Sequence, residues 1–272
     1  MRRLGLDPHA IRAVIAKDLK AVRRSKAVVI PMLVVPFLLM VVFPFSVGLA
    51  ARLRSDVDLS QFLASLPAAV RDPLLQLDPS ERLVTLVNGY LLAPLFLVVP
   101  LMVSAVLAAD AFAGEKERRT LESLLHLPVS DRDMFVAKLL GAFLPSMAIS
   151  WIGFVAFAVT SNAVAWPVMH RIFVPTRLWG VMIVWVAPAV ATLGLGVMVR
   201  VSARARTTQE ANQLGGAVIL PLIFLAVGQS TGLLFVDFPV AILIGAVIWA
   251  IALTLVARGA RKFQRDVLAT RL

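Results

Sequence analysis

The chain has 272 residues, of which 60% are apolar and 16% are charged, and its formal net charge is +11 at pH 7. Soluble domains are only about half apolar, so this composition, with a mean hydropathy of +0.88, indicates a protein that resides in a lipid bilayer. The chain contains no cysteine, which excludes disulfide bonds and thiolate metal sites.

Residues 1–26 are expected to form a basic amphipathic helix that lies in the membrane interface. Asp7-Pro8 supplies an N-cap and a first-turn proline. Apolar residues then recur at helical spacing, and basic residues fall on the opposite side: Ile11, Val14, Ile15, Leu19 and Val22 against Arg12, Lys20, Arg23 and Arg24. A simple charged flank is the alternative. Asp18 falls inside the apolar arc, which suggests that this face contacts protein as well as membrane.

Six uncharged segments are long enough to cross a membrane. A span needs about 20 residues to cover a hydrocarbon core about 30 Å thick, and backbone groups in lipid must bond within their own segment. We therefore predict an all-α membrane protein in which residues 27–272 form one six-span domain. The predicted spans are Ala27–Ala51, Leu83–Ala109, Leu139–His170, Leu178–Val199, Ala211–Val236 and Phe238–Ala257. The first span is too long for the apolar part of a signal peptide.

Basic residues predict the orientation of these spans. The segments 1–26, 110–138, 200–210 and 258–272 would share one side and carry 21 Lys and Arg, whereas the opposite loops carry 6. By the positive-inside rule, both termini and the hairpin 110–138 are expected in the cytoplasm, and the loop 52–82 outside. Topology and contact with anionic lipids explain the net charge without any nucleic acid.

Local patterns predict several helix boundaries. Capping signals precede the second, third and fifth spans: Asp78-Pro79-x-Glu81, Ser130-x-x-Asp133 and Thr207-x-x-Glu210. Small residues at Gly194-x-Gly196 would permit close helix approach in the fourth span. Gly215-Gly216 should loosen the fifth span, and the polar run Gln229–Gly232 interrupts it near the outer face, where a re-entrant element is expected.

The sequence offers little for catalysis. The predicted spans contain no Asp, Glu, Lys or Arg, which an intramembrane enzyme would place there. The three histidines, His9, His126 and His170, fall on two sides of the membrane, so a shared metal site is not expected. No G-x-x-x-x-G-K-[ST] loop is present to bind ATP phosphates. We predict no catalytic residue, metal or cofactor in this chain, and any transport would draw its energy from a separate subunit.

The charged hairpin between the second and third spans admits two interpretations. Gly114–Arg119 would extend the second span, and Leu121, Leu124 and Leu125 would form a small apolar face beside Glu122. A short helix of this kind suits docking into a groove of another protein. A solvated loop whose leucines rest on the bilayer is an equally good interpretation from these residues alone.

The stretch GEKERRTLESLLHLPVSDRDMFVAK, from Gly114 to Lys138, resembles the signature hairpin of type-2 ABC exporter permeases. That pattern runs Gly-Glu-(Lys/Arg)-Glu-Arg-Gly-Thr-Leu-Glu, then Leu-Leu, a Pro-(Val/Leu)-Ser turn and a later Lys. Arg119 departs from the frequent Gly. Two weaker similarities accompany it: AVIAKDLKAVRRSK is similar to the interfacial helix of the family, with Lys17-Asp18 in place of its Lys-Glu pair, and SARARTTQEANQLGG resembles its second cytoplasmic loop.

This resemblance implies a permease subunit in the plasma membrane of a prokaryote. Such a subunit pairs with a second copy or a related permease and binds two cytoplasmic ABC ATPase subunits, which carry the ATP and Mg. Closure of the ATPases would push on the hairpin and on the interfacial helix. The coupling interface implied by the resemblance comprises Asp18, Glu115, Glu117, Arg118, Leu121, Glu122, Leu124 and Leu125. The three leucines would dock in the ATPase groove. The register would be fixed through rim salt bridges of Glu115, Glu117, Arg118 and Glu122.

The substrate is not specified by the sequence. Asn88, Tyr90, Gln213 and Gln229 are candidates for a substrate pathway, although each could instead bridge helices. A lipid, drug or other amphipathic cargo suits the apolar spans, and ion export stays open. The main alternative function is an ATPase-independent channel, scramblase or scaffold, whose hairpin would be a lipid-facing charged loop.

Overall fold

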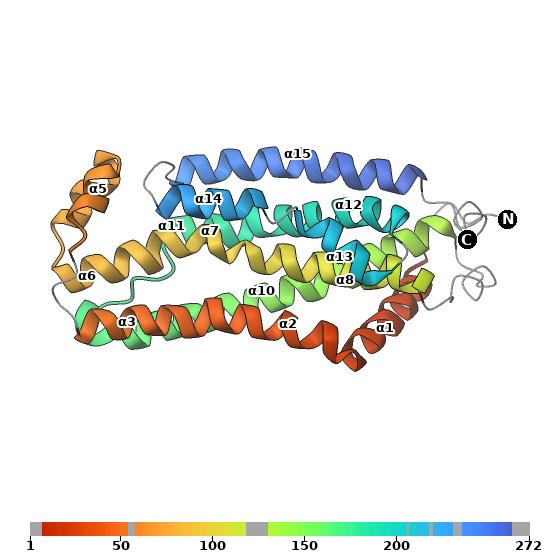
Figure 1. Ribbon diagram of the computed structural model, residues 1–272, viewed down its shortest axis with the longest axis horizontal. Coiled ribbons are helices and arrows are strands. Elements are labelled where there is room, and N and C mark those ends of the chain that lie inside the picture. Colours follow the sequence, from red (N-terminus) through yellow and green to blue (C-terminus); the bar gives the residue numbers. More distant parts are fainter. Residues whose placement is uncertain are drawn as a thin grey trace.

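The computed structural model describes residues 7–53, 58–117, 130–205, 207–217, 220–230 and 236–262, and every regular element within these ranges is helical. The long helices run side by side in an elongated bundle (Figure 1). Five stretches are long and apolar enough to cross a membrane: Val28–Leu53, Pro79–Glu115, Asp131–Met169, Arg177–Arg204 and Phe238–Arg261. They correspond to the first four predicted spans and the last one.

Helix α1 (Pro8–Arg24) forms where the amphipathic pattern predicts it. The carboxylate of Asp7 accepts hydrogen bonds from the backbone N–H groups of His9 and Ala10, as an N-cap does. The buried Ile11 and Val14 pack in one apolar cluster with residues of α10 (Asp131–Met169). The apolar face of α1 therefore contacts protein, as the position of Asp18 suggested. Its depth in a membrane stays a prediction.

The first two spans each contain a π-helical segment. The first consists of α2 (Lys26–Phe37), η1 (Leu38–Val42) and α3 (Phe43–Leu53). The second consists of α6 (Pro79–Val84), η2 (Thr85–Leu91), α7 (Leu92–Phe96) and α8 (Val98–Glu117). Helix α8 continues past the predicted end at Ala109, in agreement with the predicted extension of this span beyond the uncharged core.

The predicted outer loop 52–82 contains two short helices, α4 (Ser60–Ser65) and α5 (Ala68–Leu75), at the end of the bundle opposite to α1 (Figure 1). Leu63 and Leu74 are buried in one cluster with Leu86 of η2. The prediction that Asp78 caps α6 with its side chain is wrong, since that side chain makes no capping hydrogen bond. Instead, Arg82 donates to three carbonyl oxygens at and after the end of α5 and fixes this junction.

The third span is the continuous helix α10, and the predicted cap is present, because Ser130 Oγ accepts from the N–H of Asp133 at 3.1 Å. The fourth span consists of α11 (Arg177–Val181), the π-helical η3 (Met182–Val186) and α12 (Ala187–Arg204). The last span is α15 (Phe238–Lys262).

The predicted fifth span differs from the others. It contains two shorter helices, α13 (Thr208–Gly216) and α14 (Leu220–Ser230), and residues 218 and 219 between them are outside the described residues. The predicted cap on α13 is present, since Thr207 Oγ1 accepts from the N–H of Glu210 at 3.1 Å. The count of six spans stays a prediction. The re-entrant element also stays a prediction, because residues 231–235 lie outside the described part of the chain.

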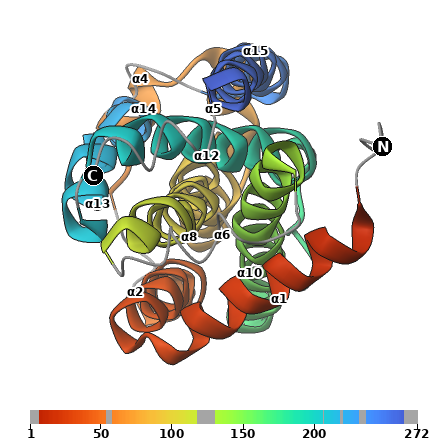
Figure 2. The same cartoon turned by 90° about the vertical axis from the view of Figure 1, so that its right-hand side faces the viewer.

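Helix α12 packs between α8 and α15, and two of its glycines permit the close approach (Figure 2). A Cβ atom added at Gly194 would lie 2.6 Å from Ser104 Oγ and 3.2 Å from the backbone oxygen of Leu101, both on α8. A Cβ atom at Gly196 would lie 2.8 Å from Leu255 Cβ on α15. The small residues of the fourth span therefore serve helix packing, as their spacing predicted.

Gly194→Ala is expected to lower the free energy of unfolding in detergent by about 1–3 kcal/mol, because the added methyl group overpacks the α8–α12 contact. The matched control is Gly180→Ala, since a Cβ atom at Gly180 meets nothing within 4 Å. Thermal unfolding of the purified variants measures both effects. Equal stability of the two variants would contradict the close packing of α12 on α8.

Candidate functional site

The segments that were predicted to face the cytoplasm gather at one end of the bundle. The helix α1, the end of α8, the beginnings of α10 and α13, and the end of α15 all lie there (Figures 1 and 2). We call this region the α1 end. It includes both helices that lead into and out of the charged hairpin.

A buried carboxylate connects three helices at the α1 end. Glu115 of α8 is only 5% exposed, and its Oε2 forms an ion pair with Lys138 Nζ of α10, which is 2% exposed. Its other oxygen, Oε1, accepts from Lys17 Nζ of α1 at 3.1 Å. Lys138 also donates to the backbone oxygen of Ala111 and lies 5.5 Å from the ring centroid of Phe112. Both members of the buried pair are therefore satisfied by several contacts, as burial of charge requires.

Asp18 borders this cluster but is less well accommodated. Its Oδ1 lies 3.4 Å from Lys17 Nζ, whereas its buried Oδ2 has no hydrogen-bond partner within the described part of the chain. Burial raises the pKa of Asp18, against the opposing attraction of Lys138 and Lys17. Burial alone would lower the pKa of Lys17, but the attraction of Glu115 and Asp18 outweighs it and raises that pKa.

Glu117 makes a second connection from the last turn of α8. Its Oε2 accepts from the backbone N–H of Thr208 at 2.9 Å, at the beginning of α13. This N–H is one of the groups that a helix start leaves without an intrahelical partner, and a negative charge there is favourable. Glu115 and Glu117 together link α8 to α1, α10 and α13 within a single turn.

The structure brings together two of the predicted coupling residues, Asp18 and Glu115, at Lys17, whereas Glu117 contacts the beginning of α13 instead. Glu115 faces inward, so it does not lie on an exposed rim. The other five predicted residues, Arg118, Leu121, Glu122, Leu124 and Leu125, fall in residues 118–129, outside the described residues. In the sequence, Lys138 stands out only as the later Lys of the family pattern. The opposite charges of Glu115 and Lys138 on the two helices that flank the hairpin permit this pairing but do not specify it.

The four predicted substrate-pathway residues do not form one cluster. Asn88 and Tyr90 lie in η2, whereas Gln213 lies on α13 and Gln229 near the end of α14, with its side chain outside the described part. Asn88 is fully buried, and its Nδ2 lies 3.4 Å from Ser161 Oγ while its backbone oxygen accepts from Trp179 Nε1 at 2.9 Å. Asn88 thus bridges three helical segments, which was the alternative for these polar residues.

Five helices long and apolar enough to cross a membrane indicate an integral membrane protein. Residues 12–240 match the family model described as an ABC-2 family transporter protein, so the chain belongs to the ABC-2 transporter family. It is the membrane component of an ABC transporter, a class that works with an ABC ATPase. A search of curated proteins found no match.

Glu115→Ala is expected to lower the free energy of unfolding by about 3–5 kcal/mol, because it leaves the charge of Lys138 buried without its carboxylate. The matched control is Lys17→Ala, which removes the half-exposed partner of the same carboxylate and should cost about 1 kcal/mol or less. Combining Glu115→Gln with Lys138→Met should recover part of the loss. Equal effects of Glu115→Ala and Lys17→Ala in thermal unfolding would contradict the buried pair.

The stability of the Asp18→Asn variant is expected to increase relative to that of the wild type as pH rises from about 4 to 7. The folded-state pKa of Asp18 is raised above its ordinary value of 3.8. The carboxyl group therefore contributes stability below that value and loses this contribution as pH rises through the folded-state pKa. Melting temperatures in detergent across this range measure the difference.

Asp58→Asn is the control for the sign of this effect. A hydrogen bond from the backbone N–H of Ser60 lowers the pKa of the exposed Asp58, so its stabilising contribution is present above 3.8 and lost as pH falls. The melting temperature of Asp58→Asn relative to the wild type should therefore fall slightly with rising pH. A pH-independent difference for Asp18→Asn would contradict the unfavourable burial of its carboxylate.

Proposed function

We propose that this permease exports a lipid, a drug or another amphipathic substrate, and that a separate ABC ATPase drives it by docking on the hairpin 110–138. Membership of the ABC-2 family supports a permease and an ATPase partner in general. The docking site, the cargo and the stoichiometry are our proposal.

The observation that carries the proposal is the buried contact of Glu115 with Lys138 and Lys17. Helix α8 leads into residues 118–129 and α10 leads out of them, and this contact joins the two helices to each other and to α1. A force applied to the hairpin would therefore displace two long spans and α1 together, instead of bending a loose loop. This is the mechanical property that a coupling element needs.

Docking itself is assigned to the leucines of the hairpin. Leu121, Leu124 and Leu125 have the i, i+3, i+4 spacing of an apolar helical face that fits a protein groove. Arg118 and Glu122 would fix the register at the rim, where each exposed ion pair contributes about 1 kcal/mol or less. Asp18, with a buried oxygen lacking a hydrogen-bond partner among the described residues, is the proposed contact of α1 with the same ATPase.

The proposed assembly contains two permeases, as a homodimer or with a related permease, and two ATPase subunits that hold ATP and Mg. We propose that the α1 end faces the cytoplasm, since the positive-inside rule favours the side with most of the basic residues, and that the cell is a prokaryote, as the family resemblance implies. The fifth segment, α13 with α14, is proposed to complete six spans. An ATPase-independent channel, scramblase or scaffold is disfavoured by the family membership.

Leu125→Asp is expected to abolish ATP-driven transport and to release the ATPase on purification, because a charge in the apolar face opposes burial in the groove. Glu122→Gln, the neighbouring control, should reduce transport less than twofold, since it removes only one rim charge. Copurification with the ATPase and transport in proteoliposomes measure both effects. A Leu125→Asp variant that still couples ATP hydrolysis to transport would overturn the docking proposal.

A further inference from the structure

The apolar side of α1 is occupied by protein. Ile11 and Val14 are buried in one cluster with Met134 and Ala137 of α10, and Val22 is buried in a second cluster with residues of α8. An amphipathic helix that lies on a bilayer places this side among the acyl chains instead. Contact of α1 with the bilayer is therefore left to its other side.

The opposite side of α1 is a row of exposed cations, namely Arg12, Lys20, Arg23 and Arg24. At about 100° per residue, the four fall within an arc of about 120° that is centred opposite Asp18. Within the part of the chain that the structure describes, none of them forms an ion pair. Lys17, at the border of the arc, differs, because Asp18 and Glu115 neutralise it.

The rest of the α1 end does not compensate this charge. The segments 1–26, 110–138, 200–210 and 258–272 hold 21 Lys and Arg against 10 Asp and Glu, whereas the opposite segments hold six of each kind. The undescribed residues of the first group add seven arginines and only two acidic residues, Glu122 and Asp266. The whole net charge of +11 therefore falls on this side, and it favours an anionic partner.

The beginning of α2 shows where the cationic row lies relative to a bilayer. Lys26, the exposed first residue of α2, lies on the same side of that helix as Ile30, Leu33 and Phe37, which are all more than half exposed. In the span Val28–Leu53, such an apolar stripe faces acyl chains. Lys26 precedes Ile30 by about 6 Å along the helix, and each headgroup layer is about 5–8 Å thick. Lys26 is therefore level with the lipid headgroups.

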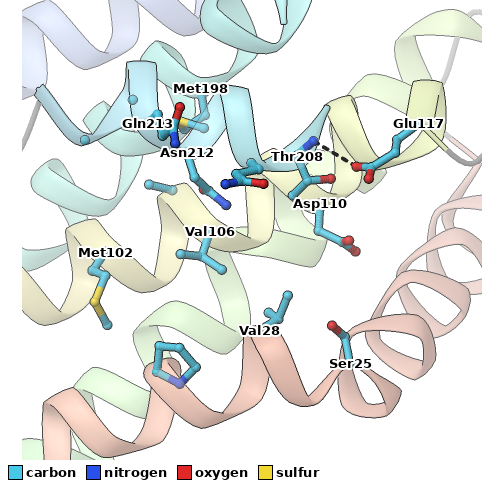
Figure 3. A pocket seen from close by; sticks show the side chains of 15 residues that line it. Ser25, Val28, Met102, Val106, Asp110, Glu117, Met198, Thr208, Asn212 and Gln213 are labelled. Atoms are coloured by element: carbon cyan, nitrogen blue, oxygen red, sulfur yellow. Dashed lines mark hydrogen bonds between the residues drawn. The ribbon is translucent and has the colours of Figure 1, made fainter. Parts of the chain in front are cut away.

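The inner side of the same junction faces protein. Ser25 and Val28 point toward a groove of about 770 Å³ between α2, α8 and α13 (Figure 3). Pro31 continues this wall along α2. The cations thus lie outside the bundle, where the phosphate of a lipid reaches them from the bilayer.

We propose that Lys20, Arg23, Arg24 and Lys26 bind the phosphate group of an anionic phospholipid. Guanidinium groups suit this ligand, because they donate two parallel hydrogen bonds to phosphate oxygens. The position of Lys26 beside the lipid-facing stripe favours a lipid over an acidic protein as the partner. The bilayer then holds α1 by its basic side, while α10 holds it by its apolar side.

Lipid bound to α1 would also restrain the base of the hairpin, since Lys17 of α1 pairs with Glu115 of α8. Anionic lipid would thereby regulate the movement that the ATPase imposes on the permease. This consequence rests on the proposed function, whereas the binding of lipid does not.

Thermal unfolding of the full-length permease in a neutral detergent measures the binding. Phosphatidylglycerol and phosphatidylcholine with identical acyl chains are added in increasing amounts, because a ligand that binds only the folded state raises the melting temperature. We expect phosphatidylglycerol to reach its half-maximal effect at a concentration at least about tenfold lower than phosphatidylcholine. About 1 M NaCl should remove most of this difference by screening. Equal effects of the two lipids would overturn the proposal.

Two double variants locate the site. Arg23→Gln combined with Arg24→Gln should raise the half-maximal concentration of phosphatidylglycerol at least about tenfold. Arg200→Gln combined with Arg204→Gln removes the same charge at the same end, but from α12, which packs between α8 and α15. This control should change the value less than about twofold. All four arginines are exposed, and melting temperatures without lipid check that both variants fold. Equal sensitivity of the two pairs would show only diffuse attraction and overturn the site.

Inorganic phosphate and glycerol phosphate distinguish a lipid from a soluble phosphate compound. Neither should displace phosphatidylglycerol at millimolar concentration, and displacement would overturn the assignment to a lipid. Failure of this proposal is separable from failure of the proposed function, because the lipid measurement uses neither ATPase nor transport. Loss of the lipid preference with Leu125 still required for transport would overturn only the lipid site, and the reverse result would overturn only the coupling.

Discussion

The structure depends on burying a lysine and a glutamate between two helices without leaving either charge unsatisfied. Each ion loses several kcal/mol of hydration when it is buried, and attraction compensates only when the geometry and the additional hydrogen bonds are good. Lys138 meets Glu115, the oxygen of Ala111 and the ring of Phe112, and Glu115 also meets Lys17. Separation of α8 from α10 at this point would remove the Glu115–Lys138 pair and the other contacts of Lys138 with α8, so the contact keeps the base of the hairpin together.

The last turns of α8 present different chemistry on their two sides. At about 100° per residue, Glu115 lies about 140° around the helix from Asp110, whereas Glu117 and Asp110 lie within about 20° of each other. One side therefore holds α1 and α10 through neutralised charges. The other side holds α13 through the contact of Glu117 with Thr208. A single helix end thus connects the base of the hairpin with α1, α10 and α13.

Local sequence signals predicted local structure well. The caps at Asp7, Ser130 and Thr207 were predictable because each depends on residues within three positions of one another. The close packing at Gly194 followed from the absence of a side chain. Asp78 occupies the predicted N-cap position of α6 without a side-chain hydrogen bond, and this junction has a tertiary contact of Arg82 with the end of α5 that no local pattern predicts. Pairing of Glu115 with Lys138 across 23 residues depends on which helical faces meet, and one sequence does not specify this.

Glu115 and Asp18 lie in the same cluster but differ in how well the protein satisfies their carboxylates. Glu115 is satisfied within the chain, so its contacts favour one arrangement of α1, α8 and α10. Asp18 lies beside the same lysines, yet burial raises its pKa and one oxygen finds no hydrogen-bond donor in the described part of the chain. A donor supplied from outside would lower the free energy of the charged carboxylate. Within the permease, α1 is held by the apolar cluster of Ile11 and Val14 with α10 and by the ion pair of Lys17 with Glu115. We propose that the unfavourable burial of Asp18 makes α1 responsive to a partner that approaches the α1 end.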